Sequence, residues 1–419
     1  MLFRSRPRAR ARVTTAAHAA TARRSRFAVL QSIEFRRLFL ANGASGIGNW
    51  LALLALQIEV YDRTHSGWWV GALLIANMLP AIVVGLFLGP LVDRLSRKEL
   101  MIACDVGRMA VFAALPFVHR TPLIIALAFV AGIGYAFFRP AVLAGVPNLV
   151  SEDELPDANA LLQFVEWGST VIGSLVGGAV VAASGPSLAY WINAGTFAVS
   201  AAFIVRIPAR QLQSERSIGR GHWSDVREGF EAIFRSPALL TVLVSWSIAH
   251  IAIGGINLAE IFLARRAYET GNFGFGLMVA AAGVGLIVGG LWARSAAQLV
   301  GMRSAYPRAL LVFAAGTLGA ALAPNVWVGA CALFVYGLGN GVAVVLNITL
   351  VQRGAPDAIR GRALTAIIAV NYAVLLAAFL AAGPLTNVAG ARVVYAISAG
   401  ALVVAAVSAV RLLPREAVV

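Results

Sequence analysis

Charged residues are scarce in this chain. They occupy 13% of its 419 positions, whereas 59% of the positions are hydrophobic and the mean hydropathy is +0.80. Soluble globular proteins usually contain about 25% charged residues, so the composition excludes an ordinary soluble domain. The apolar residues instead form runs close to the length of about 20 helical residues that crosses a bilayer.

Cysteines and catalytic motifs are also lacking. The two cysteines, Cys104 and Cys331, lie in apolar runs and indicate neither a disulfide nor a metal site. The chain contains no G-x-x-x-x-G-K-[ST], no H-E-x-x-H and no G-x-S-x-G. No polar stretch is long enough to form a domain that binds ATP. We therefore expect no enzyme, no cofactor and no metal, and a primary pump only if a separate subunit supplies the ATPase.

The apolar runs predict an all-α membrane protein with six spans in each half of the chain. The third and ninth runs are the shortest, and Pro116 and Pro324 lie near their ends. The predicted spans are residues 38–60, 68–91, 100–118, 122–147, 159–183, 187–206, 238–264, 272–293, 308–323, 326–351, 362–384 and 391–413.

Basic residues lie mostly on one side of these spans. Lys98 is the one lysine, and every other member of the 34 basic residues is an arginine. The positive-inside rule places this basic side and both termini in the cytoplasm, so the net charge of +15 reflects topology and not nucleic-acid binding. The excess of arginine over lysine suggests a GC-rich genome and hence a bacterial cytoplasmic membrane. The exceptions to the asymmetry are Arg63, Arg120, Arg265, Arg266 and Arg392 on the outside, and Arg108 and Arg139 within spans.

Polar stretches divide the chain into five parts. We expect residues 1–35 to be a basic, disordered cytoplasmic tail and not a signal peptide, because no apolar core with a cleavage site adjoins them. Residues 36–206 and 238–413 are the predicted six-helix bundles, and residues 414–419 a second tail. Residues 207–237 form a cytoplasmic linker, in which Trp223 to Phe234 is predicted to be a short amphipathic helix on the inner surface.

The two halves match each other at a constant offset of 205 residues. Glycines recur in register over about 130 positions without a gap, and Tyr190 falls on Tyr395. The chain is therefore interpreted as two parallel copies of one unit, residues 36–206 and 241–411, which in an apolar chain indicates a transporter with its pathway between the halves. The matched glycines are Gly71 with Gly276, Gly85 with Gly290, Gly132 with Gly337, Gly134 with Gly339, Gly178 with Gly383, Gly185 with Gly390, and Gly195 with Gly400.

The loop between the second and third spans, GPLVDRLSRK at residues 89–98, resembles the signature loop of the major facilitator superfamily, G-x-x-x-D-R-x-G-R-[RK]. Ser96 stands where the family has its second glycine. The resemblance implies the twelve-helix fold of that family and a gate in which the loop carboxylate is held at the start of the eleventh span. The residues that it assigns to this gate are Gly89, Asp93, Arg94, Arg97, Lys98, Arg360 and Arg362.

Other segments resemble one branch of the family, the bacterial exporters related to the enterobactin exporter and to drug/proton antiporters. They are the fourth span with its exit, residues 132–161, and the loop QRGAPDAIRGRAL at residues 352–364. The fifth span is similar to the antiporter motif g-x-x-x-G-P-x-x-G-G, with Ser174 where the motif has proline. Gly-rich spans also occur as tight packing faces. The motif glycines are Gly168, Gly173, Gly177 and Gly178.

Four charged residues lie at a similar depth within the first half, namely Asp105, Arg108, Arg139 and Glu166. Charges inside a bilayer require partners or water. We predict that Asp105 pairs with Arg139 and that Glu166 carries a coupled proton, because an acid that loses its basic partner binds a proton more readily. The alternative is a fixed ion-pair network that braces the third, fourth and fifth spans.

The resemblance also implies a cavity lined by the first, fourth, seventh and tenth spans. The polar residues that these spans offer are Asn49, His250, Asn257 and Asn347, with Glu260 a turn beyond Asn257. Each of them is a candidate for the substrate cavity, and each is equally compatible with hydrogen bonding between helices.

The function predicted from these features is secondary-active export of a hydrophobic or amphiphilic small molecule, coupled to protons. The alternatives are export of a siderophore or another metabolite, import of a small metabolite, and a polytopic protein without transport. The expected partners are the substrate, protons and the lipid bilayer, with no nucleic acid and a monomeric state. Because the 205-residue offset places Leu310, Val344 and Asn371 opposite Asp105, Arg139 and Glu166, coupling and gating are assigned to the first half.

Overall fold

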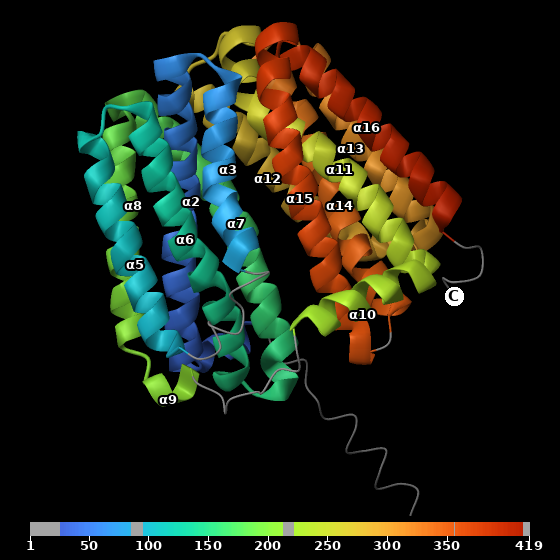
Figure 1. The fold of residues 1–419 in the computed structure, drawn as a ribbon, viewed down its shortest axis with the longest axis horizontal. Coiled ribbons are helices and arrows are strands. Elements are labelled where there is room, and N and C mark those ends of the chain that lie inside the picture. The colour runs from blue at the N-terminus through green and yellow to red at the C-terminus, as the bar shows by residue number, and fades with distance from the viewer. Residues whose placement is uncertain (1–25, 85–94, 213–221, 356, 414–419) are drawn as a thin grey trace, which may run out of the picture.

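The computed structural model describes residues 26–84, 95–212, 222–355 and 357–413, and in these ranges the chain is built from helices (Figure 1). Eleven of the described helical segments are long and apolar enough to cross a membrane, and the shorter apolar helix Gly67–Val83 supplies one more. The predicted all-α architecture with twelve spans is thereby confirmed. The second predicted span runs on to residue 91, and its part beyond residue 84 lies outside the described residues.

The first half contains six long helices, which begin after the short helix η1 (Arg26–Gln31). Three short 3₁₀ turns, η3 (Leu115–Phe117), η4 (Val146–Asn148) and η5 (Glu152–Glu154), extend or join them. The six helices are α2 (Ile33–Thr64), α3 (Gly67–Val83), α5 (Arg97–Ala114), α6 (Thr121–Gly145), α7 (Leu155–Ser184) and α8 (Pro186–Val205).

The second half follows two linker helices, α9 (Ala209–Leu212) and α10 (His222–Arg235). The helix α10 lies where the sequence predicts an amphipathic helix. A short π-helical turn, η6 (Leu263–Ala267), continues the first long helix of this half. Its six helices are α11 (Pro237–Phe262), α12 (Asn272–Val300), α13 (Met302–Leu322), α14 (Val326–Gly354), α15 (Asp357–Ala389) and α16 (Ala391–Leu412).

The helix α13 begins earlier than the sequence predicts. It starts at Met302 and contains Pro307, whereas the predicted span starts at residue 308. Pro307 is the sixth residue of this helix, so it removes one backbone hydrogen bond inside α13 without ending the helix. The helix extends back to Gly301, whose φ of 76° marks the turn from α12.

The internal repeat is visible in the packing of the glycines. A Cβ atom on Gly132 of α6 would lie 2.6 Å from the carbonyl oxygen of Asn77 on α3. A Cβ atom on Gly337 of α14 would lie 2.0 Å from the carbonyl oxygen of Ala282 on α12. Both contacts are related by the same 205-residue offset, and each requires glycine because the two backbones touch. The two-repeat architecture predicted from the sequence is confirmed.

The same offset relates two turns in the left-handed region. Gly185, between α7 and α8, has a φ of 76°, and Gly390, between α15 and α16, has a φ of 84°. Glycine adopts this conformation without the steric penalty of a side chain. Five residues after each turn, Tyr190 and Tyr395 are fully buried, so each repeat fixes its last helix with a glycine turn followed by a buried tyrosine.

The two halves meet closely at the end that carries the junctions between α2 and α3 and between α15 and α16 (Figure 1). The backbones of α3 and α15 touch there, since a Cβ atom on Gly67 would lie 2.5 Å from the carbonyl oxygen of Gly383. The backbone N–H of Gly67 also donates to Oδ1 of Asn387 at 2.8 Å. Arg265, in the turn after α11, reaches Asp62 at the end of α2. This end is called the closed end below.

At the opposite end, which carries α9 and α10, the two sets of helices diverge (Figure 1). The linker helix α10 belongs to the second half in this region. Its Glu228 forms an ion pair with Arg362 near the start of α15, and Gly229 lies against the carbonyl oxygen of Arg362. The helix α10 is thus attached to the second half, and this end is called the divergent end below.

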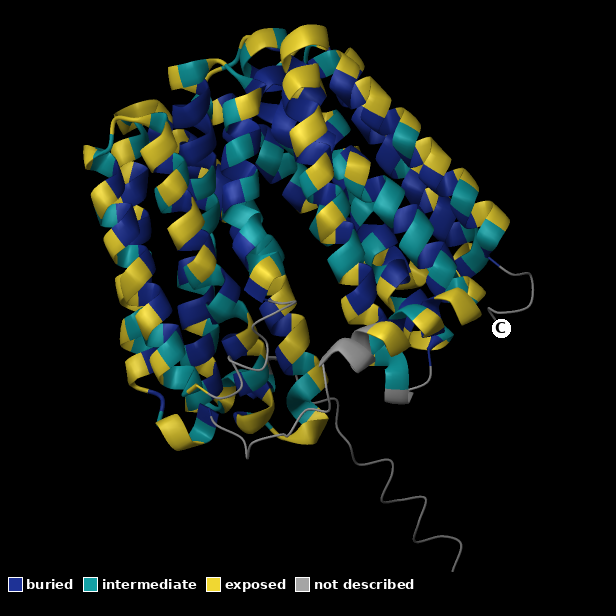
Figure 2. Ribbon diagram, in the orientation of Figure 1, coloured by how far each residue is buried: buried dark blue, intermediate teal, exposed yellow. Residues whose placement is uncertain are grey.

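The outer surface of the helix assembly is apolar. Large hydrophobic side chains point outward, among them Leu291 at 71% exposed and Val388 at 89% exposed, and Figure 2 shows exposed residues along the outward faces of the helices. An apolar surface of this extent on a water-soluble protein would cause aggregation. Lipid is the environment that it matches, and the chain is a multi-pass membrane protein.

Candidate functional site

A cavity of about 410 Å³ lies between the two halves. Helices α2, α3, α5, α6 and α7 line it from one half, and α11, α12, α14 and α15 from the other. Its walls are largely apolar and aromatic. The charged members of its described lining are Arg139, Glu166 and Glu260, and the amide-bearing members are Asn42, Asn49, Gln57, Asn77, Asn257 and Asn340.

Arg139 and Glu166 form an ion pair on the wall of the first half. Arg139 projects from α6, and its Nη1 donates to Oε2 of Glu166 on α7. The two side chains are 29% and 30% exposed, and both line the cavity. Because neither group is sealed in the protein, water or a substrate in the cavity has access to the pair.

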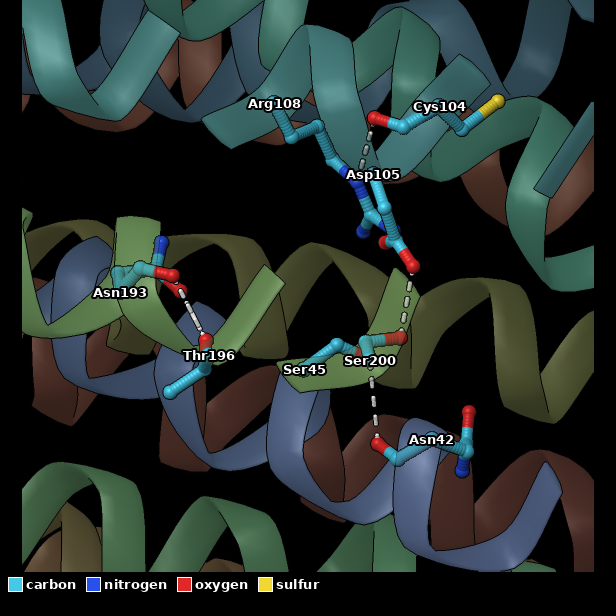
Figure 3. Close-up of polar contacts among 8 residues, drawn as sticks. All are labelled: Asn42, Ser45, Cys104, Asp105, Arg108, Asn193, Thr196 and Ser200. Carbon is cyan, nitrogen blue, oxygen red and sulfur yellow. Dashed lines mark hydrogen bonds and ion pairs between the residues drawn. The ribbon is translucent and has the colours of Figure 1, made fainter. Parts of the chain in front are cut away.

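Asp105 and Arg108 form a second pair, which is buried inside the first half (Figure 3). The Arg108 Nη2 donates to the Asp105 carboxylate at 2.6 Å, and Ser200 on α8 donates to its other oxygen at 2.7 Å. The Arg108 guanidinium lies over the rings of Phe138 and Phe197, at 4.5 and 4.3 Å from their centroids. The exposed fractions of the two charged side chains are 0% and 2%, so this pair joins α5, α6 and α8 away from the cavity.

The predicted pair of Asp105 with Arg139 is therefore wrong. Residues 138 and 139 are consecutive on α6, and consecutive side chains of an α-helix diverge by about 100°. Phe138 faces Arg108, which turns Arg139 toward α7 and Glu166. The four charges thus form two separate pairs, one accessible from the cavity and one sealed between helices.

Glu260 is the third charged group of the cavity, and it lies near the closed end on α11. Its side chain is 9% exposed. Among the residues that the structure describes, no side chain forms a hydrogen bond or an ion pair with its carboxylate. A buried carboxylate without a partner is energetically costly, so its presence requires an explanation.

The amide and histidine predictions for the cavity have mixed outcomes. Asn49, Asn257 and Glu260 line the cavity, and their contact with a substrate stays a prediction. His250 does not line the cavity. Its ring packs along α11, where Nδ1 lies 2.8 Å from the carbonyl oxygen of Trp246, one turn earlier on the same helix. Asn347 does not line it either, since it is 7% exposed and lies two turns beyond the lining part of α14.

Several lining residues were missed in the sequence. Asn340 is an amide in an apolar run, the same property that selected Asn347. The two residues share nearly the same face of α14, and their position along the helix decides between them. Gln57 follows the same pattern on α2. Tyr135 precedes Arg139 by four residues and therefore shares its helix face, which is a signal for the cavity that the sequence did contain. Tyr372 on α15 carries no comparable signal.

The glycines of the antiporter-like motif serve helix contacts on two sides of α7. Cβ atoms on Gly173 and Gly177 would meet the backbone of α2, at 2.5 Å from the Ile47 oxygen and 3.0 Å from the Leu51 Cα. A Cβ atom on Gly178 would meet α12 of the other half, 2.9 Å from the Asn272 oxygen. Gly168 has no described atom within 4 Å of such a Cβ. Three of the four motif glycines thus lie at close helix crossings.

The predicted gating loop is only partly described. Gly89, Asp93 and Arg94 lie outside the described residues. Of the rest, Arg97 donates to the carbonyl oxygens of Ala144 and Leu212, and Lys98 donates to that of Val205. In the second half, at the start of α15, Arg360 donates to the carbonyl oxygen of Ala355, and Arg362 forms an ion pair with Glu228.

Known proteins with similar sequences and folds are transporters. The sequence model of the Major Facilitator Superfamily matches residues 38–378. The multidrug efflux pump Tap of Mycolicibacterium fortuitum is 26% identical over 83% of this chain and 87% of its own length. The enterobactin exporter EntS of Escherichia coli O1:K1 is 27% identical over 78% of this chain and 79% of its own length. The crystal structure of a mutant of the nucleoside transporter NupG shares the fold, with a TM-score of 0.71, 16% identity, and coverage of 91% of this chain and 100% of that chain.

Proposed function

The chain belongs to the major facilitator superfamily of membrane transporters, and we propose that it is a secondary-active exporter of hydrophobic or amphiphilic small molecules, driven by proton antiport. The observation that carries this proposal is the cavity between the halves, whose described lining is mostly apolar and aromatic, with six amides, three serine or threonine hydroxyls and three charged groups. Sugars and phosphates require dense polar recognition, whereas such walls suit poorly polar compounds.

The arrangement of the helices supports alternating access as the mechanism. The halves touch at the closed end through Gly67 and Gly383, and they diverge at the end of α9 and α10. The positive-inside distribution favours a cytoplasmic location for the divergent end and for both termini, in a bacterial cytoplasmic membrane. In that orientation the cavity loads from the cytoplasm or the inner leaflet, as an exporter requires. The conformation that releases substrate would require the closed-end contacts to separate.

Proton coupling is proposed for Arg139 and Glu166. The pair lines the cavity, so a substrate or a helix movement that separates the two groups leaves the carboxylate free to take a proton. The Asp105–Arg108 pair is excluded from this role because it is sealed between α5, α6 and α8. The direction of transport is supported by the names of two similar proteins, a multidrug efflux pump and an enterobactin exporter.

The test is transport of a fluorescent hydrophobic dye into inside-out vesicles with an imposed proton gradient, acidic inside. We expect dye uptake into vesicles that contain the wild type, and its abolition by a proton ionophore. Glu166→Gln is expected to remove the dependence on the proton gradient, while the exposed Glu152→Gln leaves it unchanged. Gradient-dependent transport that persists in Glu166→Gln would remove Glu166 from the coupling role. Wild-type vesicles that behave like empty ones would overturn export itself.

A further inference from the structure

Three charged residues line the described part of the cavity, and their charges do not balance. Arg139 and Glu166 neutralise each other at the wall of the first half. Glu260, on the wall of the second half, has no opposite charge. An ionised cavity therefore carries one net negative charge, which it presents to whatever enters.

Four arginines near the closed end have other partners. Arg63 pairs with Glu59 at 2.5 Å, and Arg265 reaches Asp62 at 3.2 Å. Arg266 donates to the carbonyl oxygen of His65 at 2.8 Å, and Arg392 donates to that of Ala321 at 2.7 Å. None of these cations turns toward Glu260, so the negative charge of Glu260 is directed to the cavity and not to an internal salt bridge.

The surroundings of Glu260 indicate the kind of ligand that supplies the missing cation. Aromatic rings line the same cavity, including those of Phe112, Tyr336 and Phe379. Aromatic faces attract organic cations, and they do so more strongly when water is excluded. A metal ion needs several oxygen ligands, and the described residues contain no group of three or more His, Cys, Asp or Glu that could hold one. Asn340 adds an acceptor, since its buried Oδ1 has no hydrogen-bond partner among the described residues.

We infer that Glu260 is the recognition site for the positively charged group of the substrate, and that the preferred substrates are monocationic amphiphiles with an amine or onium centre. This inference rests on the proposed function, because it names the substrate class of the same cavity. The carboxylate contributes the charge, the aromatic walls contact the apolar body, and Asn340 accepts a hydrogen bond where the substrate carries an N–H. Dianionic and polyanionic compounds are disfavoured, because they would place like charge next to Glu260.

The inference is tested by binding to the purified full-length protein in lipid nanodiscs. The probes are radiolabelled tetraphenylphosphonium, a permanent monocation, and triphenylphosphine oxide, a neutral compound with similar rings. We expect the wild type to prefer the cation and Glu260→Gln to bind it about tenfold or more weakly, as expected for the loss of a charged contact. Binding of the neutral probe should be unchanged, and Glu260→Asp should retain part of the affinity for the cation.

Glu269→Gln is the matched control, because Glu269 follows on the same chain segment, is exposed and does not line the cavity. It should bind both probes like the wild type. Equal affinity of the wild type and Glu260→Gln for tetraphenylphosphonium, or no binding of the cation by the wild type, would overturn the inference. Vesicle efflux separates it from the proposed function. Binding of tetraphenylphosphonium that requires Glu260, without any export, would leave the inference standing and refute export. Proton-driven export of tetraphenylphosphonium that is unaffected by Glu260→Gln would do the reverse.

Discussion

Arg265 reaches Asp62 across the boundary between the two halves, with its Nη2 3.2 Å from both carboxylate oxygens. Arg266, the next residue, also crosses this boundary and donates to the carbonyl oxygen of His65 in the first half. Its guanidinium lies 5.1 Å from the centroid of the Phe262 ring. These contacts lie directly beyond the end of the cavity that holds Glu260. They and the close approach of α3 and α15 hold the closed end together.

Asp62→Asn is expected to shift the protein toward a conformation in which the closed end opens. The pair is partly exposed, with Asp62 at 49%, and an exposed ion pair is worth at most about 1 kcal/mol, or about a fivefold change in a population ratio. Spin labels on Trp68→Cys and Val388→Cys, both exposed near this end, would measure the change as a longer distance in a larger fraction of molecules.

The control is Asp153→Asn, an exposed carboxylate near the divergent end. It should leave the distance distribution of the closed end as in the wild type. An unchanged distribution in Asp62→Asn would mean that the glycine contacts alone determine closure.

The helices and the repeat could be predicted because they depend on properties of the chain itself. Long apolar runs have no other stable form in lipid than the helix. The 205-residue offset survives because glycines at helix crossings, such as Gly132 and Gly337, have no space for a side chain. Both signals are local or periodic and can be read directly from the sequence.

The pairing of the buried charges could not be predicted, because it depends on how each helix is rotated against its neighbours. Asp105 and Arg139 lie at similar depths, but depth does not determine which face of α6 packs against α5. The contact of the Arg108 guanidinium with the Phe138 ring determines that face, and it directs Arg139 away from Asp105. Asn340 and Asn347 share nearly the same face of α14, and the extent of the cavity along that helix decides that Asn340 lines it while Asn347, two turns farther on, is buried. Contacts of this kind become visible only when all helices are assembled.

Asp105→Asn is expected to destabilise the first half strongly. It leaves the Arg108 guanidinium buried between two rings without a counter-charge, and breaking a buried ion pair typically costs about 3–5 kcal/mol. Thermal unfolding in detergent would show a lower midpoint. Glu99→Gln removes an exposed carboxylate from the first turn of the same helix, and should cost no more than about 1 kcal/mol. Equal midpoints for the two variants would contradict the role of Asp105 as a brace.

Gly178→Val is expected to impair transport by separating the two halves. A Cβ atom at this position would lie 2.9 Å from the Asn272 oxygen and 3.0 Å from the Gly276 Cα, and backbone atoms of α12 cannot rotate away. Efflux should fall in the vesicle assay while the amount of inserted protein is unchanged. Gly195→Ala on α8 is the control, because no described atom lies within 4 Å of its Cβ. Normal efflux by Gly178→Val would show that α7 and α12 need not approach this closely.

Glu228→Ala is expected to loosen the linker helix α10 from the second half. Glu228 pairs with Arg362 of α15, whereas the ion pairs of Glu231 with described residues are those with Arg227 and Arg235 of α10 itself. Hydrogen exchange of the backbone of residues 227–235 should therefore quicken in Glu228→Ala by up to about fivefold, the limit for an exposed ion pair.

Glu231→Ala is the control. It removes a carboxylate from the same helix and leaves the ion pair with α15 in place, so it reports the effect on the helix alone. If both variants exchanged alike, the attachment of α10 would depend on the contact of Gly229 with the Arg362 carbonyl and on apolar packing, and not on the ion pair.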